Sequence, residues 1–230
     1  MKRFLKIIKV TGIVVLSLIL ILVITGFFVS EDLPNGKKGP EADQLAQQIL
    51  NELNYEAFEK TKIISWTFAG VHSYEWHKHK NYVIVSSEDY KVKLDLNDYD
   101  QSEVISSKDL DYENLIETSI RNFNNDSYWL MAPYKIMEDS VERRLVKKDG
   151  KKSLLITFIS GGTTPGDSYL WEVDENHRPT SFQMWVSIIP IGGIQAKWKD
   201  WVETQSGMIL STKKSVFGIP IEITNLKTSL

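Results

Sequence analysis

The stretch DSYLWEVDENHRPTSFQMWVSII, residues 167–189, indicates the fold class of this chain. Two runs rich in aromatic and β-branched residues flank the turn sequence DENHRP, which is typical of an antiparallel hairpin. In the second run, Phe182, Met184, Val186 and Ile188 fall on one face, because successive side chains of a strand point to opposite faces. A β-sheet with one apolar face is therefore expected here.

The same period of two recurs on both sides of this hairpin. It is clearest in YKVKLDL, residues 90–96, where apolar side chains alternate with charged ones. No fixed repeat is visible. In chain order, the predicted strands lie at residues 62–70, 73–78, 81–88, 90–96, 102–108, 153–160, 167–174, 180–189, 195–204, 208–217 and 220–227.

Helical spacing appears twice, at residues 41–54 and 109–123, each with one apolar stripe. The segment after the second helix, residues 124–135, reads as an irregular, aromatic-rich connection. The expected fold is mainly β (α+β). A single curved antiparallel sheet of about 11 strands forms a half-open barrel with two covering helices, or a barrel that the helices plug.

An uncharged apolar run at residues 10–29 has the length of a membrane-spanning helix. The basic residues before it place the N-terminus in the cytoplasm by the positive-inside rule. A cleaved signal peptide is the alternative, but Phe27, Phe28 and Val29 stand where a cleavage site needs small residues. The expected regions are a cytoplasmic N-terminus (1–9), a transmembrane anchor (10–29), a linker (30–40) and an extracytoplasmic, periplasmic domain (41–230) on the inner membrane.

The composition narrows the function classes. The chain has no cysteine, which excludes disulfides, thiol nucleophiles and a lipid-modified cysteine. It holds 27 basic and 30 acidic residues, and four of the basic ones precede residue 10, so the exported part is net acidic. An acidic domain disfavours nucleic acid as a partner.

The candidates for chemistry are weak. His72, Glu75, His77 and His79 form H-x-x-E-x-H-x-H, but the spacing fits no known zinc site and lysines flank it, so we expect no metal. The glycine-rich GGTTPGD, residues 161–167, lacks the ending of a phosphate-binding loop and is expected to be a hairpin turn. No nucleophile elbow or paired carboxylates are visible, so neither catalysis nor a cofactor is predicted.

The order of elements resembles the LolA/LolB-like lipoprotein-carrier half-barrel superfamily. The resemblance covers nearly all of residues 41–230 and includes the opening helix, the strand KIISWTFAGVH and the segments NDSYWLMAPYK, SGGTTPGDSYLWEVDE and RPTSFQMWVS. It implies an apolar cavity between sheet and helices that holds acyl chains. An anchored domain departs from the freely shuttling carriers of this superfamily.

The seven tryptophans all lie between residues 66 and 201. A lipid-binding cleft needs large apolar walls, although aromatic side chains on strands more often serve as packing. Two hypotheses stay open: a membrane-tethered binding module for a lipid, lipoprotein acyl chain or other apolar ligand, and a filled barrel that docks another envelope protein. The candidate cavity residues are Trp66, Phe68, Trp76, Trp129, Met131, Trp171, Met184 and Trp185.

Overall fold

The computed structural model describes residues 17, 29–148, 150–161 and 163–230. The predicted transmembrane anchor at residues 10–29, apart from Ser17 and Val29, and the predicted cytoplasmic N-terminus at residues 1–9 lie outside these described residues. Among the helices of the described part, none combines the length and the apolar character that crossing a bilayer requires.

The described residues form one sheet of 12 strands, and every neighbouring pair is antiparallel. Across the sheet the order is β5-β4-β3-β2-β1-β12-β11-β10-β9-β8-β7-β6, so the first and last thirds of the chain meet where β1 pairs with β12. The strands are β1 (Ile63–Phe68), β2 (His72–His77), β3 (Tyr82–Ser86), β4 (Tyr90–Asp95), β5 (Glu103–Ser107), β6 (Val141–Lys148), β7 (Lys151–Phe158), β8 (Ser168–Val173), β9 (Pro179–Trp185), β10 (Ile194–Glu203), β11 (Ile209–Val216) and β12 (Ile219–Ser229).

This architecture confirms a mainly β fold built on one antiparallel sheet and corrects the expected strand count of about 11. The additional strand is β6, whose sequence VERRLVKK has charged residues at five of its eight positions. Such a run shows little apolar alternation, and β6 lies at the edge of the sheet, where only β7 pairs with it along its full length.

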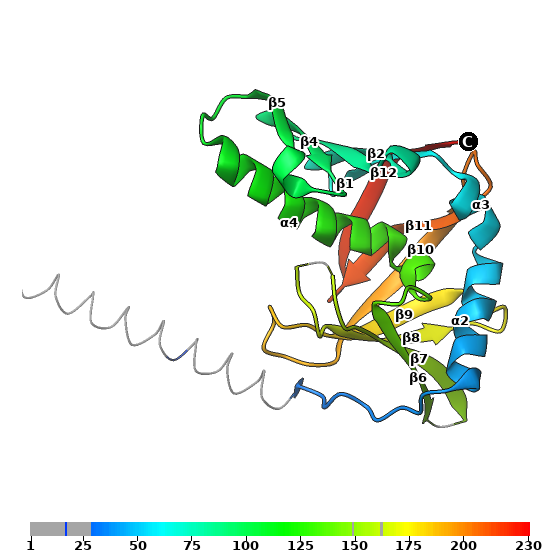
Figure 1. Cartoon of the computed structure of the whole chain (residues 1–230). Helices are drawn as coiled ribbons and strands as arrows, with labels where there is room; N and C mark the ends of the chain where they lie inside the picture. Colours follow the sequence, from blue (N-terminus) through cyan, green and yellow to red (C-terminus); the bar gives the residue numbers. More distant parts are fainter. Residues whose placement is uncertain (1–16, 18–28, 149, 162) are drawn as a thin grey trace, which may run out of the picture.

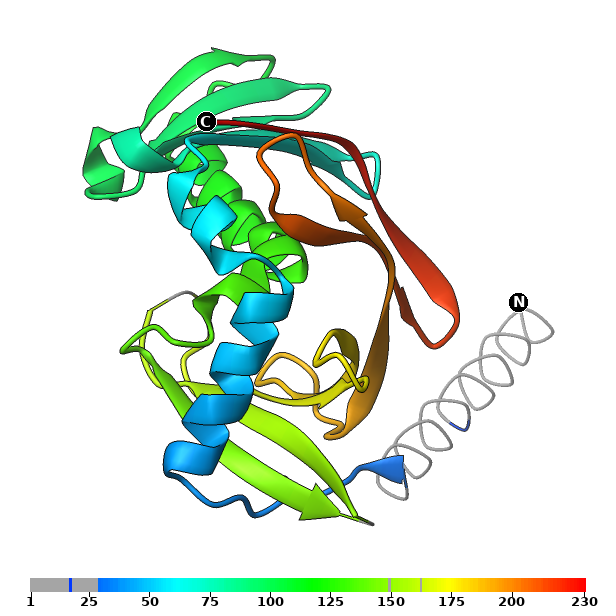
Figure 2. The same ribbon diagram turned by 90° about the vertical axis from the view of Figure 1, so that its right-hand side faces the viewer.

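The sheet curves strongly and stays open, and the helices lie across its concave side (Figure 2). The leaf of β1–β5 and the leaf of β6–β9 face each other, joined by the long strands β10–β12 (Figures 1 and 2). The α-helices of the concave side are α2 (Pro40–Glu52), α3 (Tyr55–Lys60) and α4 (Tyr112–Met131). Short 3-10 turns are η1 (Lys78–Lys80), η2 (Tyr99–Gln101) and η3 (Ala132–Lys135).

The predicted helix at residues 41–54 is correct in place, but a second helix follows it. Pro40 opens α2, and Asn54 ends the run because it takes a left-handed backbone conformation with φ 57°. The Asn54 side chain then caps α3 by accepting a hydrogen bond from the Ala57 amide. Two covering helices were predicted. The structure instead has α2 and α3 in succession, followed later in the chain by the longer α4.

The second predicted helix, residues 109–123, was too short. In the structure α4 continues to Met131 and includes most of the segment that was read as an irregular connection. The Asn124-Asn125-Asp126-Ser127 run favours turns and caps in a sequence reading, but here it lies in the middle of the helix. Tertiary hydrogen bonds to Asp126 offset the poor helix propensity, as described below.

Candidate ligand-binding cavity

A cavity of about 570 Å³ lies between the C-terminal part of α4 and the strands β7, β8 and β9. The two loops that follow β7 and β9 complete it. Its size is within the range of small-molecule sites in proteins. Most of the lining is apolar or aromatic, and the buried Ser127 lies among these side chains. The residues concerned are Phe123, Ser127, Tyr128, Trp129, Phe158, Tyr169, Met184, Val186, Ile188 and Ile189.

One wall of the cavity is a cluster of three aromatic rings. The ring centre of Tyr128, on α4, lies 4.5 Å from that of Tyr169 on β8 and 5.6 Å from that of Phe158 on β7. Burial raises the pKa of both tyrosines well above its ordinary value, so their hydroxyls stay protonated. Among the described residues, the buried hydroxyl oxygen of Tyr128 has no hydrogen-bond partner.

The floor of the cavity is continuous with the protein core. Trp129 packs on Phe182, with 5.7 Å between ring centres, and Phe182 packs in turn on Trp198 at 4.9 Å. Met184 lies beside this stack on β9 and also reaches the cavity. Met184 adds a flexible apolar surface that tolerates ligands of different shape.

Polar and charged groups surround the mouth of the cavity. They come from α4, η3, the turn between η3 and β6, and the loop after β7, and they include Arg121, Asn124, Lys135, Glu138 and Thr164. An apolar interior with a polar mouth is the distribution that an amphiphile needs, because its chain leaves water while its headgroup stays hydrated.

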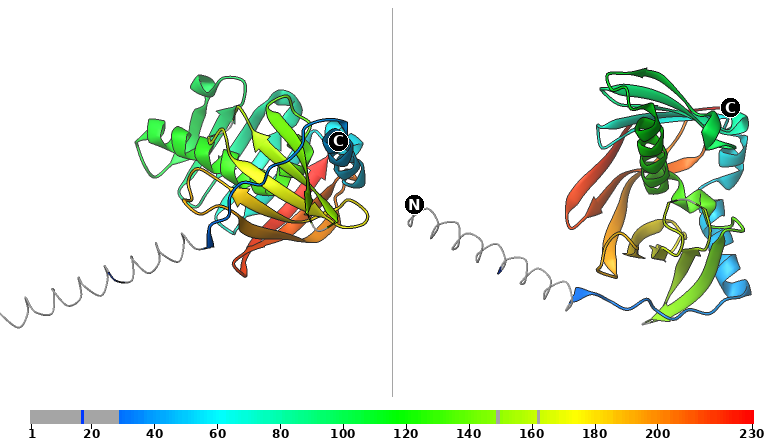
Figure 3. Two further views of the ribbon diagram at one scale, coloured as in Figure 1. Left: turned by 90° about the horizontal axis from the view of Figure 1, so that it is seen from below. Right: turned by 60° about the vertical axis from the view of Figure 1, so that its left-hand side comes forward.

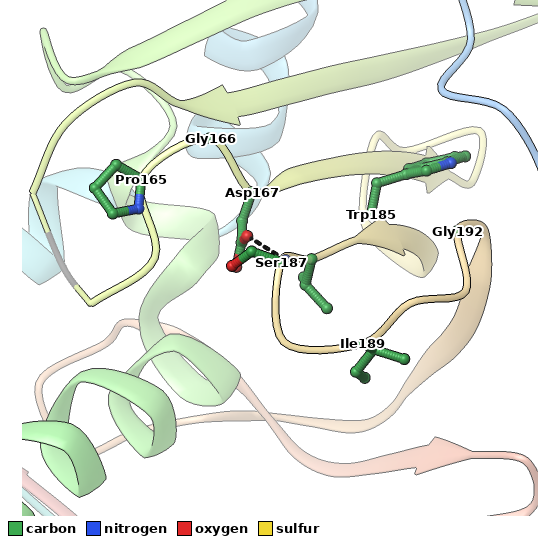
Figure 4. Close-up of a pocket in the computed structure, with 8 residues that line it drawn as sticks. Pro165, Gly166, Asp167, Trp185, Ser187, Ile189 and Gly192 are labelled. Atoms are coloured by element: carbon green, nitrogen blue, oxygen red, sulfur yellow. Dashed lines mark hydrogen bonds between the residues drawn. The ribbon is translucent and has the colours of Figure 1, made fainter.

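Asp167 connects the two loops at the mouth. This buried carboxylate accepts a hydrogen bond from the Ser187 amide at 2.8 Å, and the dashed line in Figure 4 marks this contact. The contact joins the loop after β7 to the loop after β9. The predicted hairpin turn at residues 161–167 does connect β7 to β8, and several of its described residues line the mouth.

The structure separates the eight predicted cavity residues into three groups. Trp129 and Met184 lie on the cavity wall. Trp185 lies on the opposite face of the sheet, packed on a small cluster that includes Leu155 and Leu170, and it borders a second pocket of about 380 Å³ (Figure 4). Period two explains the split, since neighbouring residues of a strand point to opposite faces.

The other five predicted residues pack in the core and do not line the cavity. Trp66 is buried, and its ring lies 4.8 Å from that of Tyr74. Trp171 is fully buried and contacts Trp198 edge to face at 4.9 Å. They are accounted for by core packing, as are the fully buried Met131 and the partly buried Phe68 and Trp76.

The histidine motif is divided between different environments. Nδ1 of His72 lies 2.9 Å from the buried Asp126 carboxylate, which also accepts a hydrogen bond from the Tyr74 hydroxyl at 2.6 Å. Nε2 of His77 lies 2.5 Å from the Glu75 carboxylate. No cluster of three or more residues suited to hold a metal ion occurs within the described ranges.

The buried network of Asp126 has a structural consequence for α4. Burial first, and the charge of Asp126 second, raise the pKa of the Tyr74 hydroxyl, so it stays a donor. Together with His72, Tyr74 fastens the middle of α4 to β2. The helix is thereby held in place along one leaf of the sheet while the cavity stays open on the other side.

Sequence reasoning missed the aromatic wall formed by Tyr128, Phe158 and Tyr169. A signal for part of it was present, because the apolar stripe of α4 continues past Phe123 through Leu130 at helical spacing. Reading residues 124–131 as helix would have placed Tyr128 and Trp129 on the concave side together with the earlier stripe.

No protein-family model and no curated protein matches this chain. Solved structures are similar to it at low identity, among them these two. A DUF1329 family protein from Desulfovibrio piger has 12% identity and a TM-score of 0.42, covering 82% of this chain and 93% of that one. A Vibrio parahaemolyticus domain described as a "putative outer membrane lipoprotein-sorting protein" has 7% identity and a TM-score of 0.35, covering 80% and 93%.

Proposed function

We propose that this protein is a membrane-tethered, extracytoplasmic binding module that holds one acyl chain of a lipid or lipoprotein. The observation that carries the proposal is the cavity of about 570 Å³ with an aromatic wall and a polar mouth. The alternative, a filled barrel that docks an envelope protein, does not account for this cavity.

The size of the cavity suits a ligand with one chain. A volume of about 570 Å³ lies within the range of sites that hold one small-molecule ligand. A free fatty acid, a lysolipid or one chain of a larger lipid fits.

Such a ligand would bind without specific contacts along its chain. Each methylene removed from water contributes roughly 0.8 kcal/mol, which is enough for tight binding once most of a chain is buried. The headgroup then stays at the mouth, near Arg121 and Lys135. We propose no chemical reaction, because the arrangement of groups around the cavity serves binding.

The experiment is photo-crosslinking with a diazirine-bearing palmitate, using the full chain reconstituted into lipid nanodiscs. Ser127 is buried on α4 and faces the cavity, so Ser127→Phe fills the space from a rigid helix, whereas Ser127→Ala leaves it open. The expected result is crosslinking to cavity peptides, at least tenfold weaker in the Phe variant, unchanged in the Ala variant and suppressed by unlabelled palmitate. Equal labelling of all three proteins, or labelling that palmitate does not suppress, would refute the proposal.

A further inference from the structure

The chain segment that follows the predicted anchor is fixed to the domain. The Glu31 amide donates a hydrogen bond to the Gly192 carbonyl at 3.0 Å, and the indole N–H of Trp185 donates to the Glu31 carbonyl at 2.7 Å. The Ser30 hydroxyl accepts from the Gly192 amide at 2.9 Å. A side chain at Gly192 would clash with the Glu31 carbonyl, so the loop has the close approach that only glycine allows.

A second attachment follows six residues later. Lys37 pairs with Leu145 at the outer edge of β6, through two backbone hydrogen bonds of 2.9 and 2.8 Å. Residues 30–37 therefore run along the domain as an attached strap, which is visible at the bottom of Figure 1. These contacts fix both ends of the strap to the domain.

The strap begins beside the second pocket, which Trp185 and Gly192 line and which shares Val186 and Ile189 with the cavity. Its contacts at Trp185 and Gly192 enclose the loop after β9, and Val186, Ile188 and Ile189 of that loop line the cavity. Figure 4 shows Trp185, Ile189 and Gly192 around this loop. A chain that enters a membrane shortly before Ser30 would bring the cavity mouth close to the membrane surface.

Exposed apolar side chains are present on the same side of the domain. We define the apolar rim as Ile159 in the loop after β7, Ile188 in the loop after β9, and Phe217 and Ile219 at the turn between β11 and β12. Ile188 is 73% exposed, Phe217 78% and Ile219 68%. Both panels of Figure 3 place the β11–β12 turn and the loop after β9 on the side where the strap begins.

We infer that the apolar rim rests in the surface of the lipid bilayer, so that the cavity opens toward the membrane. The inference rests on the membrane tether of the proposed function and adds an orientation to it. A bilayer is the occupant that the chain itself indicates, because the apolar run at residues 10–29 leads directly into the strap. Exposed large apolar side chains at loop tips gain free energy by entering the interfacial region.

The charge of the domain indicates how the rim binds. Basic residues are outnumbered by acidic ones after residue 10, so attraction to anionic lipids does not drive the contact. Binding by apolar insertion is insensitive to salt and does not require anionic lipid. A ligand chain could then pass between the leaflet and the cavity with little exposure to water.

The chain has no cysteine, which permits a direct test by single-cysteine labelling. Full-length Ile188→Cys, Phe217→Cys and Leu230→Cys proteins, each labelled with an environment-sensitive NBD dye, are reconstituted into phosphatidylcholine vesicles that contain doxyl-labelled lipid. Leu230 is the matched control, since it is 65% exposed and lies at the C-terminus, away from the rim (Figures 1 and 3). Lipid quenching at positions 188 and 217 is expected to exceed that at position 230 at least threefold, with no dependence on salt or on added phosphatidylglycerol.

Equal quenching at the three positions would overturn the inference, as would protein that does not float with the vesicles. Quenching that appears only with phosphatidylglycerol at low salt would also overturn it, since charge would then hold the contact. Phe217 does not line the cavity, so quenching at position 217 reports membrane contact independently of ligand uptake, whereas Ile188 also lines the cavity. Strong quenching at the rim together with absent crosslinking would refute the binding function and leave the membrane contact standing.

Discussion

The two leaves of the sheet meet α4 in different ways. Toward the leaf of β1–β5, the helix packs closely on β4 and β5, Phe123 contacts the rings of Trp66 and Tyr74, and Asp126 is hydrogen-bonded to β2. Toward the leaf of β6–β9, a cavity of about 570 Å³ separates the helix from the strands. One helix therefore borders a closed core on one side and an open cavity on the other, and matched substitutions can test this difference.

The largest difference is expected for tryptophan truncation. Trp66 in the closed leaf is buried among aromatic rings, so Trp66→Ala should lower the free energy of unfolding by about 3–5 kcal/mol. Trp129 is half-buried at the cavity, and part of its surface already faces empty space. Trp129→Ala should therefore lower the free energy of unfolding by only about 1–2 kcal/mol. Urea unfolding of both variants measures the difference, and equal losses would contradict the comparison.

A second prediction concerns Lys214 on β11, between the two leaves. Its side chain is fully buried, and its ammonium donates to the backbone carbonyl of Ser211. Burial lowers the pKa of Lys214 from 10.5 to about 7. Between these two pH values the unfolded chain binds more protons than the folded one, so the wild-type unfolding free energy rises with pH across this window.

The substitution Lys214→Met tests this account. It should raise the unfolding free energy by about 1–4 kcal/mol below pH 7, where the cost of the buried charge is fully present. The gain should shrink steadily as the pH rises from 7 toward 10.5. Denaturant titrations at pH 6, 8 and 10 measure it, and a gain that does not depend on pH would show that the amine is not the cause.

The smallest effect is expected for the substitution of two serines on the same helix. Ser119 and Ser127 are both buried on α4, eight residues apart. On the side of the closed leaf, Ser119→Phe adds volume where no space is free. It should lower the free energy of unfolding by about 1–3 kcal/mol. Ser127→Phe enters the cavity and should change stability by less than about 1 kcal/mol while it blocks palmitate crosslinking.

Thermal unfolding of the two serine variants gives this comparison directly, with both alanine variants as controls for loss of the hydroxyl. A Ser127→Phe protein as unstable as Ser119→Phe would mean that the cavity is not free space. A stable Ser119→Phe protein would mean that the first leaf is less closely packed than its buried rings indicate.

Much of the fold could be predicted because its signals are local. Alternation in YKVKLDL and in the hairpin of residues 167–189 depends only on the period of a strand, and the structure has strands at all 11 predicted places. Between Trp198 and Trp201, Asp200 takes φ 51°, but the pairing of β10 with β11 keeps one register on both sides of it. Local rules do not extend to β6, whose charged side chains are tolerated only because the strand lies at the edge.

The sequence by itself determined 11 of the 12 strands, most of the helices, the apolar run at residues 10–29 and the absence of thiol chemistry. Only the tertiary structure decided which aromatic residues form the core and which face the cavity. Trp66 and Trp129 are both tryptophans, but Trp66 is packed in the core and Trp129 lines the cavity. The difference comes from the distance between α4 and each leaf of the sheet. That distance follows from the curvature of the whole sheet and from the hydrogen bonds of Asp126 to β2, which join residues more than 50 positions apart.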